Sequence, residues 1–459
     1  MKKLKDLKEI IDANLGAIDI SKESKENLIK VAYKKSHKKI FKIALIPIAA
    51  SFMIVFLIVG IMPRNQYDGS KVAHAKDLMK EIKYSQIEDK GVSKSFTKAS
   101  RDFSINLFKS SIKDKENTLI SPLSVYIALA MTANGAEKET LAEFIKVLGQ
   151  DSLTMEDINN CCYAMIKSFK ESGKGLIANS VWYRDDDKLK ISEKFLETNG
   201  SYYGADAYKT DFTSSKAKED MNGWIEEGTK GLIKEVINST SKEAIMYLIN
   251  TLYFDCQWSK EYKNSDVREG IFNLTSGEKC NVDFMYSEEM YIEDNMAKGF
   301  IKPYEGNKYS FVALMPNEGT SLKDYVEALN GEKFLNLIER KNHDFAMAAL
   351  PKFKSETNIE LKHNLEKMGL NSAFNKNNKG FSKMLLDNND SLYIDRVLHK
   401  TYIEVGEKGT KAGGTTVVEV EKGSAINEKL IILNRPFLYS IVDNDTGIPL
   451  FIGTMENPQ

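Results

Sequence analysis

The sequence predicts an α+β protein with one large folded body and an apolar segment ahead of it. Two observations predict the fold class: apolar residues recur at helical spacing in several segments, and other segments are nearly continuous apolar runs of strand length. A third observation is the uncharged segment 43–62, which stands apart from this pattern. With 459 residues, of which 42% are hydrophobic and 28% charged, the chain has the composition of a globular protein with a full core.

Helices are predicted for segments 105–108, 125–132, 139–148 and 359–369, where apolar residues follow helical spacing. Ser121 and Pro122 suit the N-cap and the first turn of the second helix, because Pro lacks an N–H that would have no partner there. Gly369 suits the C-terminal stop of the last helix. Strands are predicted for 244–254, 308–316 and 344–355, the first of them buried on both faces.

The segment 43–62 is predicted to be a transmembrane helix. Twenty residues at 1.5 Å each span about 30 Å, the thickness of a bilayer's hydrocarbon core. Lysines crowd its N-terminal side, so the positive-inside rule places residues 1–42 in the cytoplasm and the folded body outside the cell. Residues 63–95 are interpreted as a linker or stalk. The alternative is secretion after cleavage of a signal peptide, with a small-x-small site at Ala73-His74-Ala75.

Composition and motifs exclude several function classes. The net charge of −1 and the spread of Lys and Arg argue against a nucleic-acid partner. The four cysteines lack the spacing of a zinc site or of a disulfide framework, so no metal and no cofactor is expected. Five histidines and no H-E-x-x-H, G-x-S-x-G or Walker motif leave no visible catalytic constellation, which argues against an enzyme.

Segment 402–437, "YIEVGEKGTKAGGTTVVEVEKGSAINEKLIILNRPF", begins and ends with residues typical of strands. Between them lie about two dozen small, Thr- and Val-rich residues with no predicted partner. A loop of that length without its own secondary structure is uncommon and is usually functional or disordered.

Several motifs, in order along the chain, resemble the serpin family. They include "NTLISPLSVYIALAMTANGAEKETLAEFIKVLG" (117–149), "MNGWIEEGTKGLIKEVI" (221–237), "LINTLYFDCQWSKEY" (248–262), "VLHKTYIEVGEKGT" (397–410) and "NRPFLYSIVDNDTGIPLFIGTMENP" (434–458). The resemblance covers 96–459. It implies a serpin fold with three β-sheets, eight or nine helices and an exposed reactive loop at about 407–430. The Lys-, Ile- and Asn-rich composition suggests a bacterial source.

The residues of this loop are compatible with its insertion into a sheet as a strand, which would point alternate side chains to opposite faces. One alternate set is uncharged: Thr410, Ala412, Gly414, Thr416, Val418 and Val420. The other set carries the charges: Lys411, Gly413, Thr415, Val417, Glu419 and Glu421. The alternation ends at Lys422, which would point inward, so the insertable strand is predicted to end there.

The resemblance implies a suicide-substrate inhibitor of an extracellular serine protease, or alternatively of a cysteine protease. The protease would attack the loop, form an acyl-enzyme and be trapped as the loop inserts into the main sheet. The family's spacing places the scissile bond at Gly423–Ser424 or Lys422–Gly423, with Ala425 third. Lys422 would suit a trypsin-like target, whereas Gly423 or Ala425 would suit a subtilisin-like one. The hinge would comprise Glu407, Gly409, Thr410, Ala412, Gly413 and Gly414.

Two further groups of residues match the family. Ser121, Ser124, Asn250 and His399 match a polar cluster beneath the centre of the sheet, where strands must part. Trp258, Lys352 and Glu407 match the place where the loop enters the sheet, and we expect an ion pair between Lys352 and Glu407.

Two alternatives remain open. The protein could be a non-inhibitory serpin that is cleaved as a substrate, because Gly413 and Gly414 replace the commoner Ala in the hinge and have low β propensity. It could also be a membrane-tethered sensor that signals through residues 1–42. The expected partners are the target protease and the membrane, and the protein is expected to be a monomer.

Overall fold

The structure is a computed structural model that describes residues 71–459 except 232, 340–343, 387–391 and 411–428. This described part contains nine α-helices and two 3₁₀ helices. They are α4 (Lys94–Ser111), α5 (Pro122–Ala133), α6 (Lys138–Gly149), α7 (Met155–Ser172), α8 (Glu193–Tyr203), α9 (Ser215–Gly228), α10 (Leu322–Ala328), α11 (Gly331–Glu339), α12 (Lys362–Lys367), η1 (Asn264–Asp266) and η2 (Ser372–Phe374).

The strands form three hydrogen-bonded sheets. One has the order β1 (Lys76–Asp77), β4 (Asp206–Thr210), β3 (Gly175–Arg184) and β5 (Met246–Phe254). Another has the order β12 (Phe353–Glu360), β13 (Leu398–Gly406), β14 (Gly409–Thr410) and β6 (Cys256–Gln257). The third has the order β15 (Lys429–Ile432), β11 (Phe345–Pro351), β8 (Lys279–Glu293), β9 (Ala297–Pro303), β10 (Tyr309–Pro316), β16 (Phe437–Asp443), β17 (Pro449–Met455) and β2 (Thr118–Ile120), with β7 (Val267–Asn273) paired to β8.

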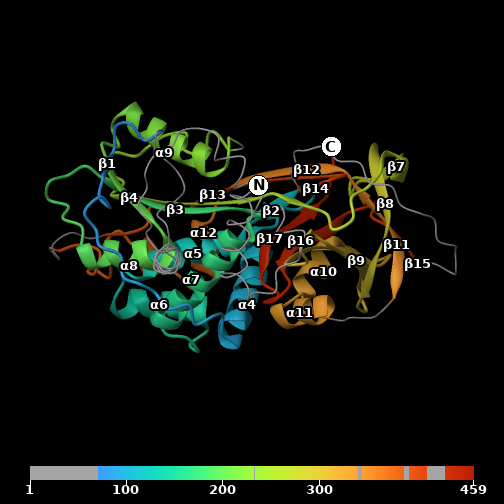
Figure 1. The fold of residues 1–459 in the computed structure, drawn as a ribbon, viewed down its shortest axis with the longest axis horizontal. Coiled ribbons are helices and arrows are strands. Elements are labelled where there is room, and N and C mark those ends of the chain that lie inside the picture. The colour runs from blue at the N-terminus through green and yellow to red at the C-terminus, as the bar shows by residue number, and fades with distance from the viewer. Residues whose placement is uncertain (1–70, 232, 340–343, 387–391, 411–428) are drawn as a thin grey trace, which may run out of the picture. The chain divides into compact units, whose positions relative to one another are not determined.

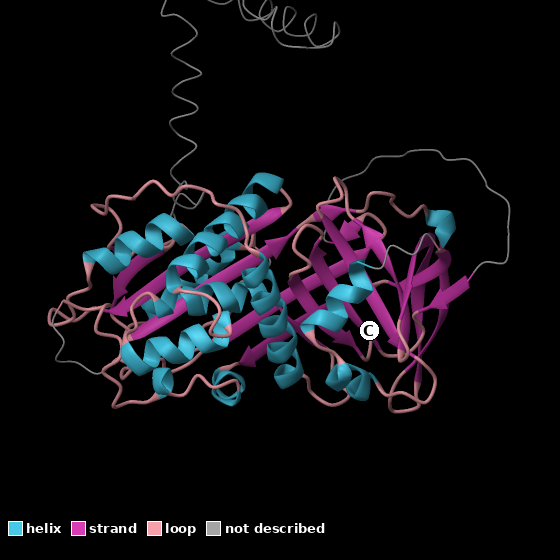
Figure 2. Ribbon diagram, turned by 90° about the horizontal axis from the view of Figure 1, so that it is seen from below, coloured by secondary structure: helices cyan, strands magenta, loops and turns pink. Residues whose placement is uncertain are grey.

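The two four-stranded sheets are halves of one layer, which we call the main sheet. They are joined because β5 leads through Asp255 directly into β6, so the chain crosses from one half to the other without a turn. Helix α9 covers one face of this layer, and α5, α7 and α8 cover the other (Figure 1). Figure 2, seen from the side of these last helices, shows them in front of the strands.

Each face of the main sheet has its own apolar core. The larger core joins the sheet to α4–α8 and to the third sheet. A smaller core lies under α9, where Trp224 and Ile225 of the helix pack with Trp182 of β3 and Tyr247 of β5. Because β5 contributes to both cores, its sequence is nearly all apolar, as the predicted burial on both faces requires.

Most predicted elements are present at their expected places. Three of the helical segments lie in α4, α5 and α6. In the fourth, 359–369, the helix α12 is shorter than predicted, because Ile359 and Glu360 still belong to strand β12; Gly369 follows α12 with a positive φ of 108°. The prediction of one strand at 344–355 was wrong, because the chain breaks at Lys352 and continues in a different sheet as β12. Ser121 is the N-cap of α5, but its hydroxyl does not cap the helix.

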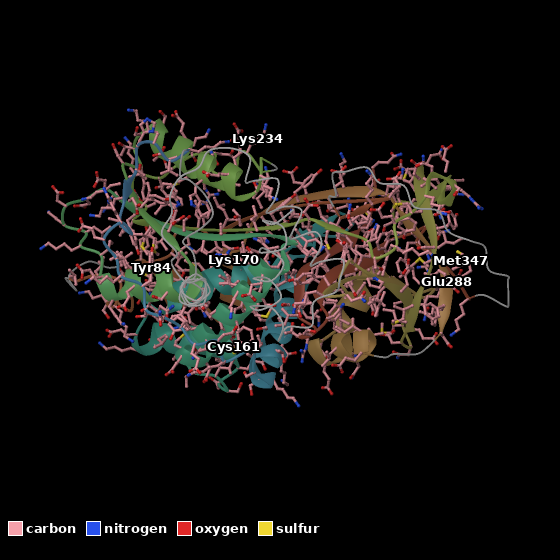
Figure 3. The ribbon with its side chains drawn as sticks, viewed as in Figure 1. Tyr84, Cys161, Lys170, Lys234, Glu288 and Met347 are labelled. Atoms are coloured by element: carbon pink, nitrogen blue, oxygen red, sulfur yellow. The ribbon has the colours of Figure 1, made fainter. Side chains whose placement is uncertain are left out.

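Much of the segment predicted to be a linker is packed onto the folded body. Strand β1 pairs with the edge strand β4, which satisfies backbone groups that the edge would otherwise expose. The buried carboxylate of Asp220, on α9, accepts the backbone N–H groups of Ala73, His74 and Ala75 at 2.7–3.0 Å. Further along, Tyr84 packs against α8 (Figure 3). The folded body therefore begins well before residue 96.

The other N-terminal predictions, residues 1–42 and the transmembrane segment 43–62, lie outside the described residues. Within the described ranges, no helix is both long enough and apolar enough to cross a membrane.

Candidate functional site

The main sheet has a gap between β5 and β13 that is closed at one end only. Within the described residues, β5 is hydrogen-bonded to β3 and β13 to β12, but β5 and β13 are not bonded to each other. At one end, β14 lies between β13 and β6 and pairs with both. We call this pairing the closed end and the separated parts of β5 and β13 the open stretch.

The closed end holds the first residues of the predicted hinge. Gly409 and Thr410 form β14, with Thr410 opposite Val405 on one side and Cys256 on the other. The Thr410 side chain is buried and its hydroxyl is hydrogen-bonded to that of Tyr304. Gly409 has no room for a side chain, because a Cβ there would overlap the carbonyl oxygen of Cys256. The chain is thus held in strand geometry up to the last described residue before the loop.

Trp258 fixes the chain that leads into the hinge. Its indole stacks on Tyr304, with ring centroids 4.5 Å apart, and its Nε1 donates a hydrogen bond to the carbonyl oxygen of Gly406 at 2.8 Å. Its backbone N–H donates to the carbonyl oxygen of Lys408 at 2.9 Å. Trp258 therefore bonds to both sides of the turn between β13 and β14, as well as contributing to the core.

The expected ion pair between Lys352 and Glu407 is present. The Lys352 Nζ lies 2.5 Å from Glu407 Oε1 and 3.2 Å from Asp283 Oδ2. Burial alone would lower the pKa of Lys352, but hydrogen bonds to the two carboxylates outweigh it and raise that pKa. Likewise burial would raise the pKa of Glu407, but the hydrogen bond from Lys352, a backbone hydrogen bond and the charge of Lys352 together outweigh it and lower that pKa.

A second ion pair near Trp258 is fully buried. Lys302 Nζ, on β9, lies 2.5 Å from Glu289 Oε1, on β8, and also donates to the carbonyl oxygen of Lys260 at 3.1 Å. The same ammonium lies 4.2 Å from the ring centroid of Tyr262 and 5.4 Å from that of Trp258. Burial lowers the pKa of Lys302, although Glu289 opposes the shift. Sequence inspection missed this pair, because nothing in either strand marks these residues as facing inward.

The predicted polar cluster is assembled beneath the gap. The backbone N–H of Ser121 donates to His399 Nε2 at 2.9 Å, and the Ser121 hydroxyl donates to the carbonyl oxygen of Leu450 at 2.8 Å. The Ser124 hydroxyl is hydrogen-bonded to the side chain of Asn250. The cluster thus links β13, β5 and the start of α5 from the side opposite α9.

His399 is neutral in this environment. Its Nε2 accepts a hydrogen bond, and complete burial lowers its pKa from 6.5 to about 4. At neutral pH the cluster therefore consists of uncharged hydrogen-bonding groups. Moving β5 and β13 apart would break hydrogen bonds in the cluster but no ion pair.

Asn179 is a further member of this cluster that sequence analysis missed. It lies on β3 opposite Asn250, is hydrogen-bonded to the Asn250 side chain, and donates to the carbonyl oxygen of Tyr203 at 3.0 Å. The sequence does contain a signal for it: Asn179 and Asn250 are each an Asn within a largely apolar strand. Because they are directly opposite each other in neighbouring strands, their side chains point to the same face.

A narrow cavity lies along the open stretch. Residues of β5 form one wall, residues of β13 the other, and the segment that follows α9 forms the roof. Its lining comprises Ile225, Ile233, Val236, Ile237, Tyr247, Leu248, Ile249, Asn250, Thr251, Arg396, Leu398 and Lys400. Figure 3 marks the roof segment by Lys234, on the opposite side of the sheet from Cys161 and Lys170 of α7. The two strands are therefore separated by space as well as by missing hydrogen bonds.

Of the predicted site residues, Ala412, Gly413, Gly414, Lys422, Gly423, Ser424 and Ala425 lie outside the described residues. The roles assigned to the described ones in opening the sheet and admitting the loop stay predictions.

A family comparison matches residues 98–458 to the model "Serpin (serine protease inhibitor)". The chain belongs to the serpin family. A serpin-like protein of Thermococcus kodakarensis is 28% identical over 408 residues, which are 86% of this chain and 93% of that protein. Human antithrombin-III is 27% identical over 363 residues, which are 75% of this chain and 77% of antithrombin-III.

Two solved structures of the thermophilic serpin tengpin are similar to this chain. The native-state structure has a TM-score of 0.80 and 43% identity, covering 84% of this chain and all of tengpin's. The latent-state structure has a TM-score of 0.70 and 40% identity, covering 81% of this chain and 99% of tengpin's. The described part of this serpin is thus more similar to the native-state structure, and the predicted three sheets and eight or nine helices are confirmed.

Proposed function

We propose that this serpin is a suicide-substrate inhibitor of an extracellular serine protease. The protease's serine oxygen would attack the carbonyl carbon of residue 422 or 423, and the amine of the next residue would leave with a proton. The remaining ester would tether the protease to the loop. Insertion of the freed loop into the main sheet would then carry the protease away and distort its active site before water cleaves the ester.

The gap in the main sheet is the observation that carries this proposal. The open stretch leaves one edge of β5 and one edge of β13 free to receive a strand, and the closed end already holds the first two residues of that strand in register with both neighbours. A strand covering residues 411–421 would gain about 1 kcal/mol net for each hydrogen bond formed. The total is on the order of ten kcal/mol or more, enough to drive a large rearrangement.

The inward side of such a strand is compatible with the polar cluster. Strand β14 is antiparallel to β13, with Thr410 opposite Val405, so each step forward in the loop is one step back in β13. Continuing this register puts Thr416 opposite His399, and on the other side the register with β6 puts it opposite Asn250. The hydroxyl of Thr416 would therefore meet the side chains of the cluster beneath the gap.

The chain's own charge pattern supports placing the inhibitory domain outside the cell, with residues 43–62 as its membrane anchor. On this proposal the serpin protects the cell surface on which it is held. Its target would be a trypsin-like protease if the bond after Lys422 is cut, and a subtilisin-like one if the bond after Gly423 is cut.

The test is to mix the full chain, in detergent, with trypsin and with subtilisin in near-equal amounts and to examine the products on denaturing gels. We expect an adduct of about the summed masses and a small C-terminal fragment whose mass locates the cut. Clean cleavage within 419–427 with no adduct would instead identify a non-inhibitory serpin.

A further inference from the structure

The open stretch ends at a groove that contains the guanidinium of Arg396. The groove has a volume of about 210 Å³ and is lined by Val236, Asn238, Asn358, Glu360, Arg396 and Leu398. Arg396 lies two residues before β13, is exposed, and also lines the narrow cavity. Among the described residues it makes no ion pair or side-chain hydrogen bond, and Glu360 is instead bonded to the backbone N–H groups of Lys362 and Val397.

The narrow cavity on one side of Arg396 is mostly apolar, whereas the groove itself also contains the polar side chains of Asn238, Asn358 and Glu360. Leu398 and Ile249 face each other across the open stretch, and the ring of Tyr247 lies next to Ile249 on the same face of β5. Ile225 and Ile233 cover them from the side of α9. A guanidinium at the end of an apolar cavity could bind a strand with two side chains on one face: an apolar one in the cavity and, two residues later, a carboxylate beside Arg396.

The register of β14 predicts which loop residues would reach this place. On the β13 side, the alignment of Thr410 with Val405 continues to Val417 opposite Leu398 and to Glu419 opposite Arg396. On the other side, the alignment of Thr410 with Cys256 continues to Val417 opposite Ile249. Both alignments assign the same face to these side chains, the face covered by α9.

We propose that Arg396 is the docking cation for Glu419 and that this pair, together with Val417 in the apolar cavity, fixes the register and the end point of loop insertion. This inference rests on the proposed function, because it needs the loop to enter the sheet. It commits the groove to one occupant, segment 417–419 of this chain, on the grounds of charge complementarity, of apolar matching and of the register already present at the closed end.

The same register offers a matched control. Glu421, the next outward residue, falls opposite Ile394, which is buried and carries no charge. Substituting Glu421 by Arg makes the same change of charge as Glu419→Arg, two residues away in the same loop. The register places Arg396 directly opposite Glu419 and not opposite Glu421, so the substitution of Glu419 is expected to act more strongly on insertion.

The experiment is a charge-reversal cycle in the full chain: Arg396→Glu, Glu419→Arg and both together, with Glu421→Arg as the control. The readout is the number of inhibitor molecules cleaved without trapping for each protease molecule trapped. This number rises when loop insertion becomes slower relative to hydrolysis of the acyl-enzyme. Each single reversal is expected to raise this number about two- to five-fold, the range of an exposed ion pair. The double reversal is expected to return it to the value of Glu421→Arg.

Two results overturn the inference, and they are distinguishable. If the single effects multiply in the double variant instead of cancelling, Arg396 does not pair with Glu419, although insertion itself stands. If the cleaved wild-type protein unfolds at the same temperature as the intact one, no loop has been inserted, and the proposed function fails together with the inference. Arg396 is exposed and belongs to neither apolar core of the described residues, so its substitution is expected to leave the fold intact.

Discussion

The two ends of the gap in the main sheet are built in opposite ways. At the closed end, Thr410 is buried, bonded to Tyr304 and paired with a strand on each side. Along the open stretch, β5 and β13 face each other across a cavity, with neutral polar groups beneath them. Because β14 already pairs with both neighbours, the register of an inserting loop would be set at the closed end before insertion begins. Further insertion would require the segment that follows α9 and the polar cluster to make room for a strand along the open stretch.

The largest expected effect comes from breaking the closed end. Thr410→Arg would place a guanidinium where a buried hydroxyl now lies, and burying an unpaired charge costs several kcal/mol. At about 1.4 kcal/mol for each factor of ten, we expect at least a tenfold loss of trapped protease, measured as adduct on denaturing gels. Thr415→Arg, at a position assigned to the outward face, is the control. Equal losses in both variants would contradict the assignment of faces.

An intermediate effect is expected from titrating the cluster under the open stretch. The pKa of His399 is about 4 in the folded protein against 6.5 as its ordinary value, so the unfolded chain binds the proton first as the pH falls. The contribution of His399 to the free energy of unfolding is therefore fully present above pH 6.5. It falls by about 3 kcal/mol in total as the pH is lowered from 6.5 to 4.

The measurement for His399 is the free energy of unfolding by denaturant at several pH values. His399→Gln is expected to lose about 3 kcal/mol less than the wild type over this pH range, because Gln does not titrate. His363→Gln, at an exposed histidine, should follow the wild type. Identical curves for wild type and His399→Gln would show that the cluster does not exclude the proton.

The smallest expected effect concerns the ion pair of Lys352 with Glu407. Both side chains are about one-third exposed, at 29% and 35%, and pairs of this kind contribute up to about 1 kcal/mol. We expect Lys352→Gln to lower the free energy of unfolding by less than about 1 kcal/mol at low salt and by less at high salt. Lys354→Gln, which removes a more exposed pair with Glu404, should change less still. A loss of several kcal/mol would mean that the pair holds the closed end together.

Sequence reasoning predicted the parts of this site that depend on the order of the family's motifs, whereas the alternation in the loop falls on residues outside the described part of the chain. Ser121, His399, Trp258 and Glu407 were assigned from the resemblance, and the contact of Lys352 with Glu407 followed from it. Asn179, Tyr304 and Asp283 were not found, because their contacts depend on strand register and on which face each residue occupies. Single strands in a sequence do not contain that information.

The N-terminal segment shows the same limit. Residues 71–92 are polar and have no strong periodicity, so they were interpreted as a stalk. Their order comes from partners that are distant in the chain: the free edge of β4 and the buried carboxylate of Asp220. Local propensity says little about a segment whose hydrogen bonds are supplied by residues distant in the sequence.

Gly409 has a consequence for the genetics of this protein. Its backbone passes so close to the carbonyl oxygen of Cys256 that a Cβ would overlap it. Since every other amino acid carries a Cβ, every missense change at this codon should separate the strand from its neighbour, whatever the chemistry of the new residue. The codon is therefore expected to tolerate only synonymous substitution, whatever freedom the codons of exposed residues such as Lys138 have.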